Sequence, residues 1–296
     1  MLGYSIHFER IKVYAASCHK LSSINGGNGT YMKESIDRSG AAHYCFAAYN
    51  TCNSVFFPRV HIPIADECHL GCFYCDFVSN GNQGILSKKP GVCDSVIWGH
   101  EGILNYLEKN LRDSSTILGV SGPGDPFSSE KQMSILFDVI NNHYPDNPLC
   151  ICSSGFGFPS IMNKIDCKRI NFITLTINTF DQKKYSQIYK NASASFSGEY
   201  LSLSQKEALD YFLPTSSKVK VNTVFLPDIN ENEIVLMFKT LYDRGVECFN
   251  LLPMSEDKVY LDKYNVAIQQ IIHLGIPLLQ QCLKCRSDSC YGWKGL

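Results

Sequence analysis

Three cysteines stand close together in the spacing C-x3-C-x2-C: Cys68, Cys72 and Cys75. They directly follow the apolar run 59–65, which is predicted to be a strand. Three thiolates this close can bind one face of a cubane iron–sulfur cluster and leave one iron open for a substrate or cofactor. Gly71 gives the loop the backbone freedom to wrap around such a cluster. A structural zinc site is the alternative, although zinc sites usually show paired C-x2-C spacings.

A second candidate site is the turn Gly122-Pro123-Gly124-Asp125, which follows the predicted strand 115–121. Its glycines allow a ligand or another backbone to approach closely, and the Asp125 carboxylate can accept a hydrogen bond from an ammonium group. By itself this tetrapeptide would be an ordinary turn. Its place at the carboxyl end of a strand, after the cysteine loop, favours a binding role.

The chain contains 14 cysteines, an unusual number for a protein whose N-terminus shows no apolar signal segment. Without export, a disulfide framework is improbable, so metal or redox use is the favoured explanation. Cys150 and Cys152 lie two residues apart in the predicted strand 148–153 and therefore point to the same side, so either can ligate. Cys282 and Cys285 form a C-x2-C pair that suits a metal site, half a zinc ribbon or a redox pair.

Apolar runs and helical patterns alternate along the chain from residue 59 onward. This alternation predicts parallel strands joined by crossover helices. Six units favour a partial (β/α)6 TIM-like barrel over a three-layer sandwich, with its chemistry at the carboxyl ends of the strands. The predicted strands are 59–65, 115–121, 148–153, 170–178, 218–226 and 247–253, and the predicted helices are about 94–111, 128–143, 181–189, 204–213, 231–244 and 259–274.

Composition excludes several classes of protein. Hydrophobic residues make up 45% and charged residues 19% of the 296 residues, which is typical of a globular chain. A formal net charge of −1 provides no basic field for nucleic acid or an anionic membrane, and no apolar run is long enough to span a membrane. Residues 1–40 are predicted to be a flexible extension and 41–296 one domain, in which 278–296 is a cysteine-bearing segment over the barrel mouth.

These motifs, in this order, resemble the radical S-adenosylmethionine (SAM) superfamily and, within it, the NifB family, which builds the precursor of the nitrogenase cofactor. The resemblance implies a radical SAM barrel with N- and C-terminal cysteine-bearing extensions. Beyond the cysteine loop, the matching stretches are HYCF (43–46), RVH (59–61), PGV (90–92), GVSGPGDP (119–126), LCICSSG (149–155), TLTIN (174–178), VKVNTVFLPDIN (219–230) and CLKCRSD (282–288).

The resemblance implies an enzyme that fuses two 4Fe–4S clusters and inserts a carbide derived from SAM. Cys68, Cys72 and Cys75 match the ligands of the SAM-binding cluster, and Tyr74 matches the aromatic residue near adenine. Further residues match ligands of two auxiliary 4Fe–4S clusters: His43 and Cys45 for the first, and Cys150, Cys282 and Cys285 for the second. The predicted contacts with SAM are Gly122, Gly124, Asp125, Ser153, Asn178 and Asn222.

The implied partners are a ferredoxin or flavodoxin that donates electrons, a cluster donor, and a scaffold or carrier that accepts the product. The implied location is the cytoplasm, with no nucleic-acid or membrane partner. The chain departs from the family at 76–89, where a cysteine, a glutamate and an arginine are missing, so Cys93 or Cys52 is the candidate for the remaining ligand of the first auxiliary cluster. Two alternatives stay open: a radical SAM enzyme with auxiliary clusters that acts on an organic or peptide substrate, and a non-enzymatic iron–sulfur or zinc carrier.

Overall fold

The computed structural model describes residues 59–75, 96–189, 198–246, 248–254, 257–276, 278–281 and 288–290. Their strands form one sheet in which each strand pairs with the next along the chain. Strands β1 to β7 run parallel, and β8 is antiparallel to β7. The strands are β1 (Arg59–His61), β2 (Ile117–Val120), β3 (Leu149–Ser153), β4 (Ile170–Thr176), β5 (Lys218–Val224), β6 (Cys248–Leu252), β7 (Leu278–Gln281) and β8 (Asp288–Cys290).

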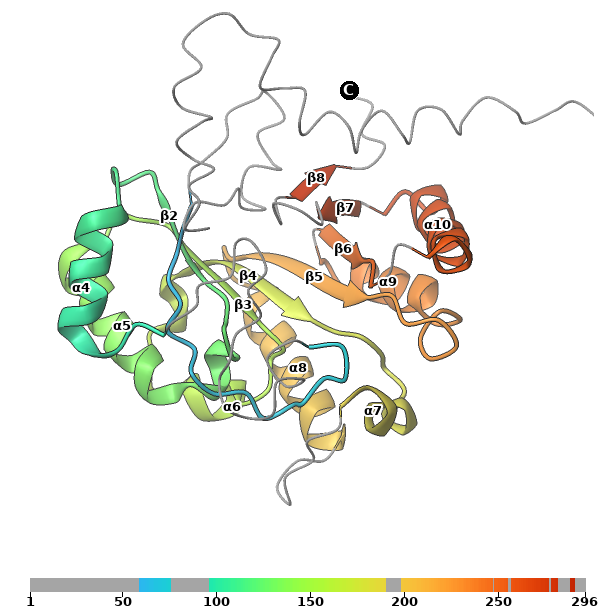
Figure 1. Cartoon of the computed structure of the whole chain (residues 1–296), viewed down its shortest axis with the longest axis horizontal. Coiled ribbons are helices and arrows are strands. Elements are labelled where there is room, and N and C mark those ends of the chain that lie inside the picture. Colours follow the sequence, from blue (N-terminus) through green and yellow to red (C-terminus); the bar gives the residue numbers. More distant parts are fainter. Residues whose placement is uncertain are drawn as a thin grey trace, which may run out of the picture.

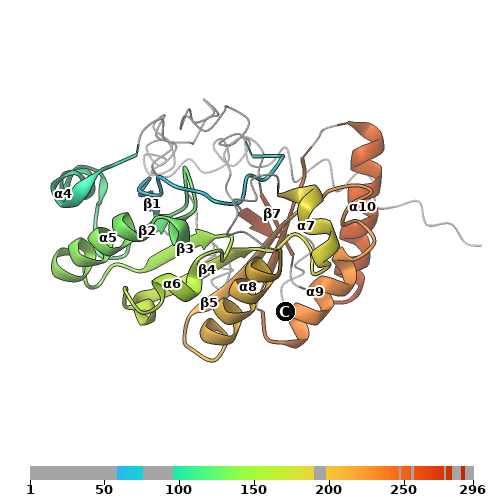
Figure 2. The ribbon, with the colours of Figure 1, turned by 90° about the horizontal axis from the view of Figure 1, so that it is seen from below.

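Helices connect consecutive parallel strands and lie in an arc outside the curved sheet (Figures 1 and 2). They are α4 (Gly99–Asn110), α5 (Glu130–His143), α6 (Phe158–Ile161), α7 (Gln182–Ile188), α8 (Gly198–Phe212), α9 (Ile234–Asp243) and α10 (Lys258–His273), with the short 3-10 helices η2 (Pro126–Ser128) and η3 (Cys167–Arg169). In the part of the chain that the structure describes, no helix is long and apolar enough to cross a membrane.

The predicted α/β fold is confirmed, and each of the six predicted strands corresponds to one of β1 to β6. Strands β7 and β8 were not predicted. Residues 278–281 are two leucines followed by two glutamines, a run too short to show a strand period. The segment predicted from 278 onward to lie over the mouth contributes the last two strands of the sheet, while 282–287 and 291–296 lie outside the described residues.

Alternation along the strands separates an apolar outer face from a polar inner face. Ile151, Leu175 and Val221 belong to the main core, which they share with the inward faces of the helices. Their neighbours on the opposite side of the sheet are polar residues or thiols: Cys150, Cys152, Thr174, Lys220 and Asn222. The sheet therefore presents polar side chains and sulfur atoms toward the interior of the partial barrel.

Candidate functional site

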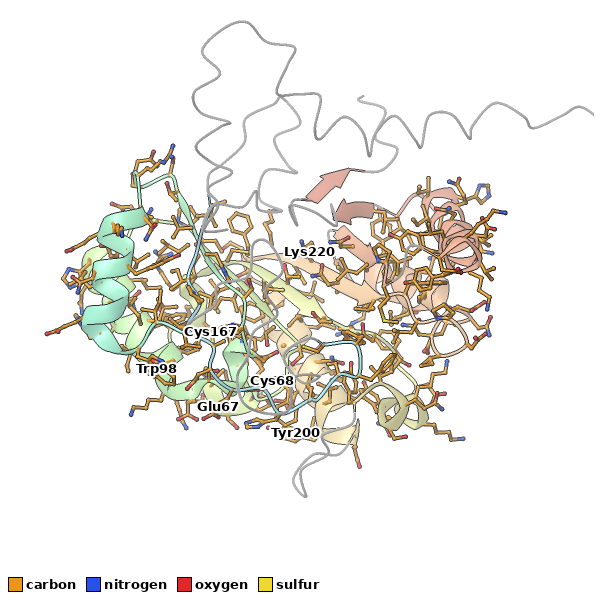
Figure 3. All side chains as sticks on the ribbon, viewed as in Figure 1. Glu67, Cys68, Trp98, Cys167, Tyr200 and Lys220 are labelled. Carbon is orange, nitrogen blue, oxygen red and sulfur yellow. The ribbon has the colours of Figure 1, made fainter. Side chains whose placement is uncertain are left out.

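The cysteine loop comprises residues 66–75 and follows β1 at the carboxyl ends of the parallel strands. Gly71 has a φ of 60°, a backbone conformation that favours glycine, and the Cys75 amide donates to the Cys72 carbonyl to close a turn. Cys68 and Tyr200 pack against the same hydrophobic cluster, and Figure 3 labels both in the lower part of the view, away from Lys220 of β5. The loop therefore lies at the carboxyl ends of the parallel strands, where it was predicted to lie.

The predicted glycine turn lies directly against this loop. Pro123 pairs with Ala65 in an isolated parallel bridge, the Gly124 amide donates to the Ala65 carbonyl (2.7 Å), and the Asp125 amide donates to the Glu67 carbonyl (2.6 Å). A Cβ atom on Gly124 would stand 2.2 Å from the Glu67 carbonyl oxygen, so only glycine permits this approach. Glu67 and Asp125 are 58 residues apart in the sequence, yet the backbones of the two segments are hydrogen-bonded to each other.

A third segment, the end of α7, supports the other side of the cysteine loop. The Phe73 amide donates to the Ile188 carbonyl (3.0 Å), and Cys72 forms an antiparallel bridge with Tyr189. Beneath the loop, a second hydrophobic cluster packs against Cys68 and Cys72. Its buried members are Leu70, Phe156, Tyr185, Ile188, Tyr189, Leu201, Val224 and Leu226.

The donor set of the loop fits an iron–sulfur cluster. All three cysteine residues are partly buried, and their thiols lie within electrostatic reach of one another. Burial, followed by the charge of Asp125, raises the pKa of Cys68 to about 12, and burial also raises the pKa of Cys72 well above its usual value. Thiolates in such surroundings need a compensating positive charge, which iron ions supply. Cys68, Cys72 and Cys75 would hold the cluster.

Among the described residues, no group of three or more histidine, cysteine, aspartate or glutamate side chains is placed to hold a single metal ion.

Asp125 joins the glycine turn to the end of β3. Its side chain is 6% exposed; Oδ1 accepts from the Phe127 amide (3.0 Å) and the Ser153 hydroxyl (2.7 Å), and Oδ2 accepts from the Ser154 amide (2.6 Å). Burial raises the pKa of Asp125, while these hydrogen bonds act in the opposite direction. The carboxylate therefore holds two loops together, and the contact of Asp125 and Ser153 with SAM stays a prediction.

We expect Asp125→Asn to destabilise the fold by about 1–3 kcal/mol, because the new amide nitrogen would face the buried Ser154 N–H and leave one donor unpaired. Urea unfolding measures the change. Ser153→Ala is the control, since it removes one donor to Asp125 without placing two donors face to face, and its cost should be smaller. Equal costs for the two variants would contradict this role of the carboxylate.

Asn178 lies just beyond the carboxyl end of β4, against Tyr74 of the cysteine loop, and its contact with SAM stays a prediction. It is 1% exposed, and both the nitrogen and the oxygen of its amide bind protein groups. Asn222, by contrast, is 8% exposed with an unpaired Oδ1, and its nitrogen lies 4.0 Å from the Cys152 sulfur. This leaves Asn222 with an acceptor for a bound ligand, while the Asn178 amide is engaged within the fold.

The thiols of β3 differ in their access to the interior of the partial barrel. Cys150 is buried, whereas Cys152 is partly exposed, and both lie on the inner face of the sheet. The other predicted ligands of the auxiliary clusters lie outside the described residues: His43, Cys45, Cys52, Cys93, Cys282 and Cys285. Their predicted roles stay predictions.

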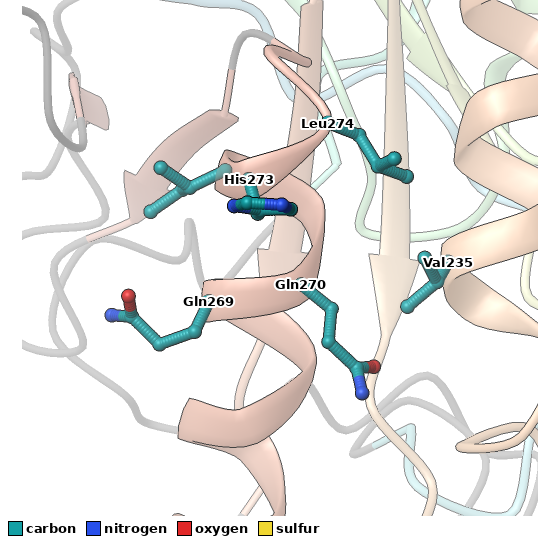
Figure 4. A pocket seen from close by; sticks show the side chains of 6 residues that line it. Val235, Gln269, Gln270, His273 and Leu274 are labelled. Carbon is teal, nitrogen blue, oxygen red and sulfur yellow. The ribbon is translucent and has the colours of Figure 1, made fainter. Parts of the chain in front are cut away.

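A shallow groove of about 730 Å³ lies on α9 and α10 (Figure 4). None of the predicted site residues lines this groove. Its lining residues are Val235, Gln269, Gln270, Ile272, His273 and Leu274.

Sequence reasoning missed three residues that support the site: Ser154, Tyr189 and Asn230. Asn230 is completely buried and hydrogen-bonds three backbone groups near the ends of β4 and β5. An asparagine shortly after an apolar strand is a turn signal, which is the feature that would have drawn attention to it. Nothing in the local sequence indicates that Tyr189 pairs with the cysteine loop.

The chain matches no protein-family profile. It is similar to proteins named FeMo cofactor biosynthesis protein NifB: 25% identical over 264 residues to that of Chlorobaculum tepidum, 22% over 281 residues to that of Azotobacter vinelandii and 25% over 247 residues to that of Klebsiella pneumoniae. These alignments cover 83%, 88% and 79% of this chain, but 61%, 54% and 52% of the respective relatives.

Among solved structures, methylornithine synthase (PylB) matches with a TM-score of 0.46 and 11% sequence identity, over 87% of this chain and 73% of that chain. The sequence matches to NifB proteins extend over about four fifths of the chain. This chain is a distant homologue of the NifB proteins.

Proposed function

We propose that this chain is a NifB-like radical SAM enzyme that fuses two 4Fe–4S clusters with insertion of a SAM-derived carbide. Its product would be the precursor of the nitrogenase iron–molybdenum cofactor. One observation carries the proposal: three cysteines with cubane spacing lie against a glycine turn at the carboxyl ends of parallel strands, in a homologue of NifB.

Each segment around the loop has a defined part in this proposal. Cys68, Cys72 and Cys75 hold the SAM-binding cluster, which supplies the electron for reductive cleavage of SAM when bound. Gly122, with a φ of 77°, would let the backbone approach the methionine part of SAM, and Gly124 lets the turn pack closely against Glu67 of the cysteine loop. Asp125 keeps this turn in place through Ser153 and Ser154.

The auxiliary clusters would lie toward the polar inner face of the sheet. Cys150 lies on that face, and Cys282 and Cys285 follow β7, which extends the same sheet. His43, Cys45 and either Cys93 or Cys52 would hold the other auxiliary cluster. A ferredoxin or flavodoxin would deliver electrons, and a cluster donor and a product-accepting carrier would act before and after the reaction, all in the cytoplasm.

SAM labelled with carbon-14 in its methyl group tests the proposal. Anaerobically reconstituted protein with dithionite should transfer the label to an iron–sulfur species that stays with the protein fraction after desalting. The Cys68→Ala/Cys72→Ala/Cys75→Ala variant should retain no label, because it lacks the ligands of the SAM-binding cluster. Cleavage of SAM without any label in an iron–sulfur species would reject cluster fusion and favour an organic or peptide substrate.

A further inference from the structure

The amide of Asn178 has a defined orientation just beyond the end of β4. Its oxygen accepts a hydrogen bond from the Val224 backbone amide (2.9 Å), so the nitrogen must face the other way. That nitrogen lies 2.6 Å from the Tyr74 hydroxyl and 3.2 Å from the Tyr189 hydroxyl. Asn178 thus donates both of its N–H groups to tyrosines: Tyr74, within the cysteine loop, and Tyr189, which pairs with that loop.

The hydrogen bond that Tyr74 accepts from Asn178 orients the Tyr74 hydroxyl proton. A tyrosine hydroxyl has one proton to donate, and here its oxygen accepts from the Asn178 amide. The Tyr74 hydroxyl also hydrogen-bonds the Cys72 thiol, so the proton is available to that sulfur. Cys72 is one of the three residues that would hold the SAM-binding cluster. These contacts therefore connect Asn178, just after β4, through the Tyr74 hydroxyl to Cys72.

A second asparagine holds Asn178 in this position. Asn230 donates to the Asn178 carbonyl (2.8 Å) and the Val224 carbonyl (2.8 Å), while its own oxygen accepts from the Leu226 amide (2.8 Å). The two asparagines thus tie the segment after β4 to the end of β5. Asn178 has little freedom to turn away from Tyr74.

We propose that Asn178 is a positioning residue that aims the Tyr74 hydroxyl at Cys72 and thereby raises the reduction potential of the SAM-binding cluster. A hydrogen bond to a ligand sulfur offsets the negative charge that a cluster gains on reduction, and so stabilises the reduced form. This inference rests on the proposed function because it requires a cluster on the cysteine loop. It gives Asn178 a role within the protein, and the contact of Asn178 with SAM stays a separate prediction.

The test is a redox titration of the reconstituted full chain, followed by electron paramagnetic resonance of the signal that changes when SAM is added. Tyr74→Phe keeps the ring and removes the hydroxyl, so it should shift the midpoint potential of that signal to a more negative value. Asn178→Leu should shift it in the same direction by no more than Tyr74→Phe does. The double variant should show no further shift, because both changes act through one hydrogen bond.

Tyr185→Phe is the matched control, since the Tyr185 hydroxyl bonds Thr179 and Gln205 rather than Asn178. The midpoint potential of this variant should stay at the wild-type value. A wild-type potential for Tyr74→Phe, with the SAM-sensitive signal intact, would overturn the inference even if Asn178→Leu lowers the melting temperature or fails to fold. A wild-type protein without any SAM-sensitive 4Fe–4S signal would instead reject the proposed function, and this inference with it.

Discussion

Replacing Cys68, Cys72 and Cys75 together by alanine is expected to lower the iron content from about 12 to about 8 per chain and to abolish reductive cleavage of SAM. The three thiols are the ligands that the cysteine loop offers to one cluster, whereas the auxiliary clusters would be held by residues elsewhere in the chain. Iron and acid-labile sulfide are measured after anaerobic reconstitution, and SAM cleavage is followed by chromatography.

Cys167→Ala is the matched control for the triple variant. Cys167 is buried in the main core and lies outside the site, so its loss should leave both the iron content and the cleavage of SAM unchanged. About 4 iron per chain in the wild type, lost entirely in the triple variant, would mean a single cluster. Cluster fusion would then be ruled out as the activity of this chain.

Gly124→Ala is expected to weaken SAM binding about 10- to 100-fold and to reduce occupancy of the SAM-binding cluster. The added Cβ would stand 2.2 Å from the Glu67 carbonyl oxygen, so either the glycine turn or the cysteine loop must move. Movement of either segment disturbs two backbone hydrogen bonds at once, those of the Gly124 and Asp125 amides. Equilibrium binding of SAM to the reconstituted protein measures the loss.

Gly102→Ala provides the same chemical change at a position outside the site. Gly102 lies within α4, where an added Cβ would meet Ile97 Cγ2 at an ordinary distance of 3.4 Å. Alanine is the better helix former, so this control should bind SAM normally and gain up to about 1 kcal/mol of stability. Wild-type SAM affinity in Gly124→Ala would show that the close approach of the two loops is not needed for binding.

The candidate cluster ligands and the fold class can be predicted from local sequence. The C-x3-C-x2-C spacing specifies three soft ligands on one short loop, because residues this close in the chain stay close in any fold. Alternating apolar runs and helical patterns specify parallel strands with crossover helices, which places the cysteine loop and the glycine turn at the same end of the sheet. These predictions depend only on spacing and periodicity.

Contacts between distant segments were decided by tertiary structure alone. Asn178 was expected to face the mouth because it is a polar residue of the predicted strand 170–178, but its hydrogen-bond partners there, Tyr74 and Tyr189, lie 104 and 11 residues away in the sequence and could not be named from it. Likewise, Asp125 was predicted to meet a ligand, and its carboxylate binds Ser153 and Ser154. A buried polar group forms hydrogen bonds with the groups that tertiary packing places next to it. The sequence therefore identifies the polar group but does not identify its partner.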